Sequence, residues 1–173
     1  MFKVCDKVFY GAHGVCEILE IKSCSIAGEV KEYYILKPVY QPHSTLYVPV
    51  TNQALTSKMH PLLSREEIEE LINTMPQEET LWLEDDTLRK ETYNKILAGG
   101  ERKKIVQIIK TLYLEQSIRH SLGKRLRQSD QQILGRAEDL LYHEFALVLN
   151  ISPDQVLPLL QRKIELPKRE KQA

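Results

Sequence analysis

The sequence lacks the marks of a membrane protein, a secreted protein or a small metal-bound domain. No apolar run approaches the roughly 20 residues that a membrane-spanning helix needs. The opening MFKVCDKVFYG has no apolar run after a basic start, so we expect no signal peptide. Only three cysteines are present, Cys5, Cys16 and Cys24, with no CxxC pair. This argues against a disulfide or zinc framework and for reduced thiols in a cytoplasm, and we expect all three cysteines to be small buried residues.

Catalytic and cofactor-binding motifs are absent as well. The sequence contains no GxxxxGKS/T, GxGxxG, GxSxG or HExxH pattern, so we expect neither an enzyme nor a bound cofactor or metal. The five histidines are scattered, and we interpret His13 as a turn residue and His143 as an ordinary helix residue. The acidic run at 84–86 suits either a metal site or a helix N-terminus, where carboxylates interact favourably with the helix dipole. We favour the helix N-terminus.

Charge is unevenly distributed, although the net charge is zero. Residues 1–80 carry 7 Lys and Arg against 11 Asp and Glu, whereas residues 81–173 carry 17 against 13. Between residues 100 and 129 there are 8 basic residues and only 2 acidic ones. A local excess of this size attracts polyanions such as nucleic acids, and the first half of the chain has no comparable patch.

The first fifty residues predict a small antiparallel β barrel or curled sheet. Short segments rich in β-branched and aromatic residues alternate with turn signals, such as the turn at 11–14 and a hairpin turn at 27–29. Fifty residues bury little core, so this domain should lean on the rest of the chain. The expected strands are residues 7–10, 15–24, 32–37 and 44–50.

From residue 64 the apolar residues follow helical spacing. Ser64 and Glu67 form a capping box that opens a helix, and Pro76 ends it. We expect a linker over 77–80 and a second helix from Asp85 or Asp86 that Gly99-Gly100 stops. Further helices are expected over 101–119, 129–149 and from 153 onward, with a basic connector over 122–127 and a disordered tail over 167–173.

Trp82 is the only tryptophan and lies where the linker meets the helical region. Two roles are open for it. The ring can pack in the core of the protein, which is the role that the residues alone favour. Alternatively it can be presented to a partner, because aromatic side chains insert at base steps or stack on unpaired bases, for about 1–3 kcal/mol per base.

Several segments together resemble the CarD family of bacterial transcription regulators. FKVCDKVFYGAHGVCEI at 2–18 resembles the family's opening F-x-V-G-D-x-V-x-Y-x-x-H-G, with Cys5 in place of its glycine. IAGEVKEYYILK at 26–37 resembles I-x-G-x-x-x-E-Y-x-V-L, and LYVPV at 46–50 resembles V-x-V-P. ILAGGERKKIVQIIKTLY at 96–113 and AEDLLYHEFALVL at 137–149 resemble the family's helical motifs, so the resemblance covers residues 2–149.

The resemblance implies a Tudor-like N-terminal domain that binds the β subunit of RNA polymerase through a sheet edge. In such β-augmentation, backbone hydrogen bonds supply affinity and side chains select the partner. Two positions that are often arginine at this interface are Cys24 and Tyr47 here. The residues assigned to polymerase binding are Cys24, Ile26, Tyr34, Tyr47 and Pro49.

The resemblance also implies that the helical domain contacts promoter DNA at the upstream edge of the transcription bubble. There a tryptophan wedges into the minor groove and basic residues contact phosphates, which stabilises the open complex without reading sequence. This favours the DNA-wedge role for Trp82, although its acidic neighbours at 84–86 depart from the family pattern. For each implied phosphate contact, the alternative is that the residue lies on a solvated helix face without binding DNA. The implied contacts are Arg89, Lys90, Lys95, Arg102, Lys103, Lys104, Lys124, Arg125 and Arg127.

We therefore predict an α+β protein with a Tudor/SH3-like antiparallel β barrel over 1–53, a connecting helix and linker over 54–80, and an all-α domain over 81–166. The expected function is that of a cytoplasmic, nucleoid-associated transcription regulator. We expect a monomer whose partners are RNA polymerase and promoter DNA, and we expect no membrane partner. The alternative is a protein–protein adaptor that uses the β domain without binding DNA. The acidic start of the helical domain favours that alternative, and the basic segment over 100–129 counts against it.

Overall fold

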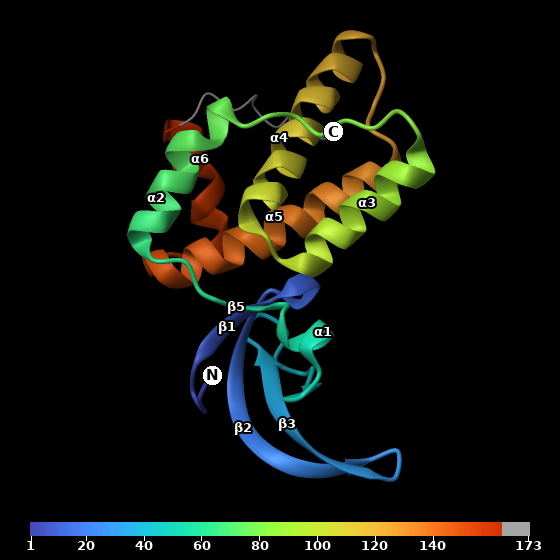
Figure 1. Cartoon of the computed structure of the whole chain (residues 1–173). Helices are drawn as coiled ribbons and strands as arrows, with labels where there is room; N and C mark the ends of the chain where they lie inside the picture. The colour runs from blue at the N-terminus through green and yellow to red at the C-terminus, as the bar shows by residue number, and fades with distance from the viewer. Residues whose placement is uncertain (164–173) are drawn as a thin grey trace. The chain divides into compact units, whose positions relative to one another are not determined.

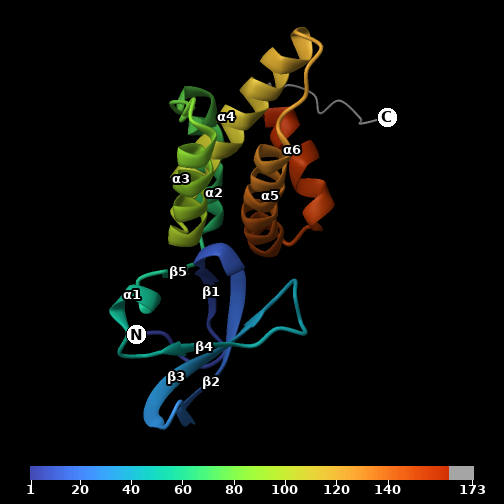
Figure 2. The same cartoon turned by 90° about the vertical axis from the view of Figure 1, so that its right-hand side faces the viewer.

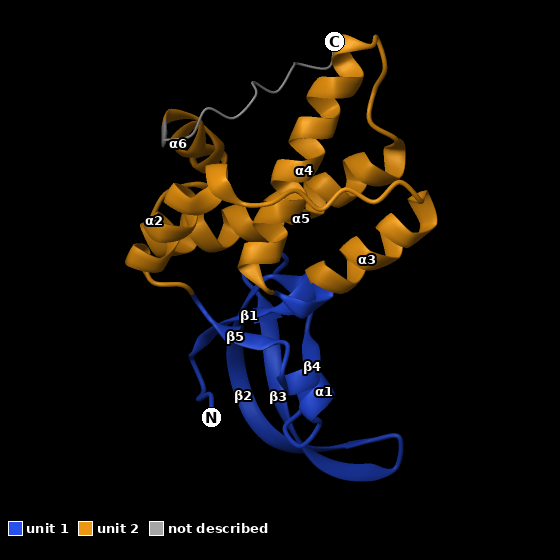
Figure 3. Cartoon of the chain, turned by 45° about the horizontal axis from the view of Figure 1, so that its top comes forward, with its two compact units in different colours: residues 1–62, 98–100 blue, residues 63–97, 101–173 orange. Residues whose placement is uncertain are grey.

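The computed structural model of the chain describes residues 1–163. The chain divides into two compact units, unit 1 with residues 1–62 and 98–100 and unit 2 with the remainder (Figure 3). The sequence predicts a β domain that ends at residue 53 and a connecting segment over 54–80. Unit 1 instead extends to Leu62, because one more strand follows residue 53 and pairs with the first strand.

Within the described residues, unit 1 is a five-stranded antiparallel sheet in the order β4-β3-β2-β1-β5. Strands β2 and β3 form a long curved hairpin (Figures 1 and 2). No pairing joins β4 to β5, so the curled sheet keeps two edges in the part of the chain that is described. The elements of the unit are β1 (Lys7–Tyr10), the 3-10 turn η1 (Gly11–His13), β2 (Val15–Ile26), β3 (Glu29–Pro38), β4 (Leu46–Pro49), α1 (Gln53–Thr56) and β5 (Met59–Pro61).

The β2–β3 hairpin closes through a two-residue turn. Ile26 pairs with Glu29, and the two residues between them, Ala27 and Gly28, have φ angles of 55° and 82°. Positive φ at both positions is the mark of a type I′ turn, whose twist matches that of the flanking strands. The predicted turn is therefore confirmed, with Gly28 suited to its conformation and Ala27 held in a left-handed one that costs an L residue about 1–2 kcal/mol.

Alternation along the strands gives unit 1 a core face and an outer face. Paired residues lie on the same face, so Tyr34 shares the core face with Ile21 and Val48. The core cluster consists of Val8, Tyr10, Cys16, Ile18, Tyr34, Leu36, Val48 and Met59. The outer face of β2, β3 and β4 carries Glu20, Lys22, Cys24, Ile26, Glu29, Lys31, Tyr33, Ile35, Tyr47 and Pro49.

The three cysteines are free thiols, but the expectation that all three are buried is wrong. Cys16 is buried, Cys24 is half-buried and Cys5 is exposed. Burial raises the pKa of the Cys16 thiol to about 12. Cys5 lies in a turn with a φ of 72°, a conformation that glycine adopts without steric cost. The CarD-like pattern has glycine at this position, so its use of glycine there has a backbone reason.

In its described residues unit 2 consists of helices joined by loops, with no strand. Its predicted capping box is confirmed, because the Ser64 N–H donates to Glu67 Oε2 at 2.7 Å and the Glu67 N–H donates to Ser64 Oγ at 3.1 Å. The predicted basic connector at 122–127 separates α4 from α5. The elements are α2 (Arg65–Thr74), η2 (Met75–Gln77), α3 (Asp86–Gly99), α4 (Arg102–Ser121), α5 (Gln128–Leu149), η3 (Pro153–Gln155) and α6 (Val156–Lys163).

The core of unit 2 uses only part of α4. Buried residues of this helix run from Arg102 to Tyr113, and none follows before its end. Figures 1 and 2 show this end of α4 projecting beyond the other helices of the unit. Its apolar residues Leu114 and Ile118 are each 47% exposed, and Leu122, just past the helix, is 66% exposed.

The predicted fold class, a small Tudor-like β domain followed by a helical region, is confirmed. Among residues 1–163 no helix combines the length and apolar character needed to span a membrane. The predicted tail over 167–173 lies outside the described residues.

Candidate functional site

The backbone around Trp82 is held by side chains of unit 2. Just before Trp82, the C=O of Leu81 accepts a hydrogen bond from the Tyr93 hydroxyl. Just after it, the C=O of Leu83 accepts from Arg89 Nη1 at 2.7 Å. Trp82 is therefore fixed in position although it lies outside regular secondary structure.

The Trp82 ring is half-buried and rests on a cation. The guanidinium carbon of Arg89 lies 4.2 Å from the ring centroid, and that of Arg119 lies 6.0 Å from it. Ring Nε1 donates to Glu84 Oε1 at 3.0 Å. Cation–π contacts of this kind stabilise the ring's position. The ring is thus neither enclosed in the core nor loosely displayed, because part of it is supported and part is accessible to a partner.

Arg89 does not offer a positive charge to a ligand. Its side chain is 1% exposed, and its Nε and Nη2 donate to Asp130 Oδ1 and Oδ2 at 2.9 and 2.8 Å. Hydrogen bonding to the Asp130 carboxylate holds the pKa of Arg89 above its ordinary value. The sequence-based assignment of Arg89 to a phosphate contact is corrected, because its guanidinium is buried and paired with Asp130. This bidentate pair joins α3 to α5, and the same guanidinium packs against the Trp82 ring.

The carboxylates of the acidic run at 84–86 accept hydrogen bonds from donors of unit 2. Most of them lie at the N-terminus of α3, as the sequence favours. Asp85 Oδ1 accepts from the Leu88 N–H at 2.7 Å and so caps α3. Asp86 accepts from Arg89 Nη2 at 2.7 Å and also pairs with Arg127. Among the described residues no three His, Cys, Asp or Glu side chains are placed to hold a metal ion. The carboxylates beside Trp82 are thus engaged by donors of the same unit, which reduces their repulsion of a phosphate.

Arg102 is the second corrected phosphate contact. It is 9% exposed, and its Nε and Nη2 donate to Glu144 Oε2 and Oε1 at 3.0 and 2.9 Å. Glu144 Oε1 also accepts from the Leu63 N–H at 2.9 Å. The pair therefore joins the start of α4 to α5 and to the segment before α2.

The remaining predicted basic residues are exposed, and some have acidic neighbours. Lys103 Nζ lies 3.6 Å from Glu78 Oε1, and Lys104 Nζ lies 3.2 Å from Glu101 Oε2. The exposed set consists of Lys90, Lys95, Lys103, Lys104, Lys124, Arg125 and Arg127.

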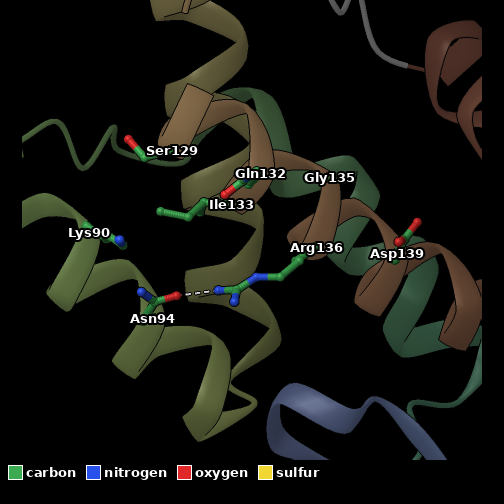
Figure 4. Close-up of a pocket in the computed structure, with 8 residues that line it drawn as sticks. All are labelled: Lys90, Asn94, Ser129, Gln132, Ile133, Gly135, Arg136 and Asp139. Carbon is green, nitrogen blue, oxygen red and sulfur yellow. Dashed lines mark hydrogen bonds between the residues drawn. The ribbon is translucent and has the colours of Figure 1, made fainter. Parts of the chain in front are cut away.

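A groove between α3 and α5 brings Lys90, an implied phosphate contact, together with polar residues that no sequence motif marks (Figure 4). Arg136 Nη2 donates to Asn94 Oδ1 from the opposite helix. In the sequence these residues look like the solvated faces of two separate helices, so only the packing of α3 against α5 reveals them. The lining residues are Lys90, Asn94, Ser129, Gln132, Ile133, Gly135, Arg136 and Asp139.

In unit 1, the candidate surface is the open edge of β4. The Val50 N–H donates to Glu32 O on β3 at 2.9 Å. Because backbone groups alternate in direction along a strand, those of Val48 also face β3, and those of Tyr47 and Pro49 face the open edge. Proline has no N–H. Within β4 the open edge therefore presents the N–H and C=O of Tyr47, whereas the Pro49 C=O accepts a hydrogen bond from the Asn52 N–H at 3.1 Å.

The side chains around this edge form a small mixed patch on the outer face. Tyr47 is 50% exposed, and its ring meets Tyr33 edge-on at 6.4 Å between centroids. Lys22 Nζ lies 3.0 Å from Glu20 Oε2 on the same face. The patch combines an aromatic anchor, a charged pair and an unused strand edge, which are the components of a peptide-binding surface.

Comparison with protein families identifies unit 1. The family described as "CarD-like/TRCF RID domain" matches residues 2–62. Unit 1 is a CarD-like RNA polymerase-interacting domain (RID). The matched range ends at Leu62, like the first segment of unit 1, and therefore includes β5. The RID gives this chain a transcription-related role with RNA polymerase as its partner.

The RID places four of its five predicted contact residues on one face. Cys24, Ile26, Tyr47 and Pro49 lie on the outer face, and Ile26 is 42% exposed. Tyr34 lies on the core face and is 5% exposed. Its assignment to polymerase binding is corrected, because its side chain fills the core of the RID. For the other four residues the assignment stays a prediction.

Proposed function

We propose that this protein is a non-enzymatic transcription regulator that docks on the β subunit of RNA polymerase through its RID and stabilises the promoter open complex through DNA contacts of unit 2. The family match over residues 2–62 carries the proposal. In this proposal the protein acts as a monomer in the bacterial cytoplasm, associated with the nucleoid, and needs no cofactor.

The β4 edge is the proposed docking site, and it favours a short strand pairing. A β-subunit strand that adds to β4 can exchange hydrogen bonds with the N–H and C=O of Tyr47, but Pro49 supplies no donor. Each such bond contributes about 0.5–1.5 kcal/mol net, so backbone pairing alone gives modest affinity. Contacts of Tyr47 and Ile26 on the outer face then supply the remaining affinity and the choice of partner.

Trp82 is the proposed DNA wedge. Its backbone is fixed, its ring is supported by Arg89, and part of the ring is accessible. A rigidly held ring loses little conformational entropy when it inserts at a base step, and aromatic wedges use this at the edges of unstacked DNA. The exposed lysines and arginines of unit 2 contact phosphates, so binding depends on salt and hardly on sequence.

The docking geometry is tested with a variant that removes a single backbone donor. Tyr47→Pro deletes the outward N–H and leaves the β3–β4 hydrogen bonds intact, because those come from Leu46 and Val48. Proline is tolerated on an edge strand at such a position. In a titration of core RNA polymerase, Tyr47→Pro should bind on the order of tenfold more weakly than Tyr47→Ala, which loses only the side chain.

Pro49→Ala is the matched control for this experiment, because it adds an outward N–H to the same edge. It should bind as well as or better than the parent protein. Equal affinities for Tyr47→Pro and Tyr47→Ala would remove edge pairing from the proposal. If the parent protein binds neither the polymerase nor its isolated β subunit, the docking claim itself is removed.

The DNA half of the proposal is tested through open-complex lifetime. Trp82→Ala should shorten the lifetime of a competitor-challenged promoter complex while polymerase affinity stays unchanged, because the RID is untouched. Trp82→Phe keeps an apolar ring and should recover part of the lifetime. An unchanged lifetime, together with flow-through of the parent protein on heparin, would favour the adaptor that binds protein partners alone.

A further inference from the structure

The groove between α3 and α5 has the composition of an anion site. Its volume is about 370 Å³. Lys90 comes from α3 and Arg136 from α5, and both side chains are exposed. Figure 4 shows Arg136 reaching toward Asn94 on the opposite helix, with Ser129 and Gln132 along the same groove. Two cations and several neutral donors thus line one concave surface.

Within the described residues, the two cations of the groove have no acidic partner. Elsewhere in unit 2, Arg89, Arg102 and Arg127 are each paired with a carboxylate. Lys90 and Arg136 form no ion pair within residues 1–163, although Asp139 also lines the groove. Arg136 is oriented instead by the neutral amide of Asn94. An oriented but uncompensated guanidinium is suited to an external anion.

Gly135 leaves part of the groove unfilled. It lies inside α5, where glycine is less favourable than alanine by about 1 kcal/mol. A Cβ built at Gly135 meets no atom within 4 Å, so neither packing nor a left-handed backbone requires the glycine. Because Gly135 lines the groove, its missing side chain leaves room there for a ligand.

We propose that this groove binds a DNA backbone phosphate, with Arg136 and Lys90 as its cationic contacts. The inference rests on the proposed DNA-binding function and names a phosphate site within it. A phosphodiester carries a single charge and acceptor oxygens, which match one guanidinium, one ammonium and the amide or hydroxyl donors of Asn94, Gln132 and Ser129. Asp139 limits the site at one end, because its carboxylate repels a phosphate.

The site is tested by anisotropy titrations of the full chain with a fluorescein-labelled duplex of mixed sequence, from about 50 to 200 mM salt. Arg136→Ala and Lys90→Ala should each weaken binding about 5- to 10-fold and reduce the salt slope by about 1. Asp139→Asn should strengthen binding. The matched control is Arg65→Ala, which removes an exposed arginine of α2 that has no ion pair within the described residues.

A neutral variant separates the groove from general electrostatics. Gly135→Leu fills the groove without changing charge, and it should weaken duplex binding on the order of tenfold while raising the midpoint of thermal unfolding. Asn73→Leu adds the same side chain on the exposed face of α2 and should leave duplex affinity unchanged.

The outcomes distinguish failure of this site from failure of the proposed function. If the parent protein binds no duplex, DNA binding itself is lost from the proposal. If the parent binds but the groove variants behave like Arg65→Ala and Asn73→Leu, the phosphate lies elsewhere. If inorganic phosphate shifts the amide NMR signals of α3 and α5 while the duplex leaves them unchanged, the groove is a small-anion site and the inference is overturned.

Discussion

The two units of this molecule satisfy their polar groups in different ways. In the RID the sheet pairs its own backbone around an apolar cluster, and its ion pairs, Glu20–Lys22 and Glu29–Lys31, are exposed. In unit 2 the helices close their own backbone hydrogen bonds, but the segments between them need side chains. All the buried polar and charged residues described lie there, namely Arg89, Arg102, Thr111, Asp130, Glu138 and Glu144.

This difference explains where each unit can bind a partner. A sheet leaves an unused backbone edge, so the RID can recognise a strand without a buried charge. A helical unit has no such edge, and its binding surface must come from side chains that the fold holds in place. The Asp130–Arg89–Trp82 arrangement does this, because a buried ion pair supports an accessible ring.

Breaking the buried pair of unit 2 should have the largest effect. Arg89→Met leaves the Asp130 carboxylate, 2% exposed, without its cation, which should lower the free energy of unfolding by about 3–5 kcal/mol. Urea unfolding followed by Trp82 fluorescence and circular dichroism measures it. Arg127→Met removes the 57% exposed partner of Asp86 and should cost at most about 1 kcal/mol. Similar losses for both variants would show that burial of the pair is unimportant.

Glu144→Gln sharpens the same contrast with a smaller change. The amide keeps the shape of the side chain but loses the charge that faces Arg102, so we expect a loss of roughly 2 kcal/mol in urea unfolding. Glu101→Gln makes the same change at an exposed pair with Lys104 and should be nearly neutral. A Glu101→Gln loss as large as that of Glu144→Gln would contradict this reading.

In the RID the sensitive feature is backbone conformation. Cys5→Gly relieves a left-handed residue at φ of 72° and should stabilise the protein by about 1 kcal/mol. Cys24→Gly makes the same substitution within β2 and should destabilise it by about 0.5–1 kcal/mol. Thermal unfolding of the two variants measures both effects, and a shift in the same direction for both would refute the backbone explanation.

Acidification should produce the smallest effect. Burial lowers the pKa of His143, with Asp139 acting in the opposite direction, so the unfolded state binds this proton more readily. Stability is therefore lost as the pH falls from about 6.5, the ordinary histidine value, through the lowered folded pKa. His143→Asn should flatten the dependence of the urea midpoint on pH between about 7 and 5.5. An unchanged dependence would assign it to other groups.

Local patterns were enough to predict most elements of the fold. Turn residues marked the β2–β3 hairpin, and the Ser64 capping box marked the start of α2. β5 was missed because its three residues are too short to show alternation. The face of Tyr34 was not readable either, because residues 33–36 are all buried and the two-residue period disappears.

The candidate site was less predictable than the fold, for a physical reason. Arg89 finds Asp130 41 residues away along the chain, and Arg102 finds Glu144 42 residues away. Nothing near either arginine in the sequence distinguishes a buried, paired side chain from a solvated one. The contact between Arg136 and Asn94 in the groove is equally hard to predict from the sequence, because the two residues belong to different helices. Residue type could suggest a basic surface, but only tertiary packing decides which charges remain available.

The projecting end of α4 has a consequence for the time scale on which this helix opens. Its backbone hydrogen bonds beyond Tyr113 are held by helix geometry with little burial behind them, so they open by fraying from the C-terminal end. In deuterated water the amides from Glu115 to Ser121 should exchange far sooner than those between Ile105 and Leu112, whose release requires unit 2 to unfold. One continuous helix should therefore show two exchange regimes, with the change where its burial ends.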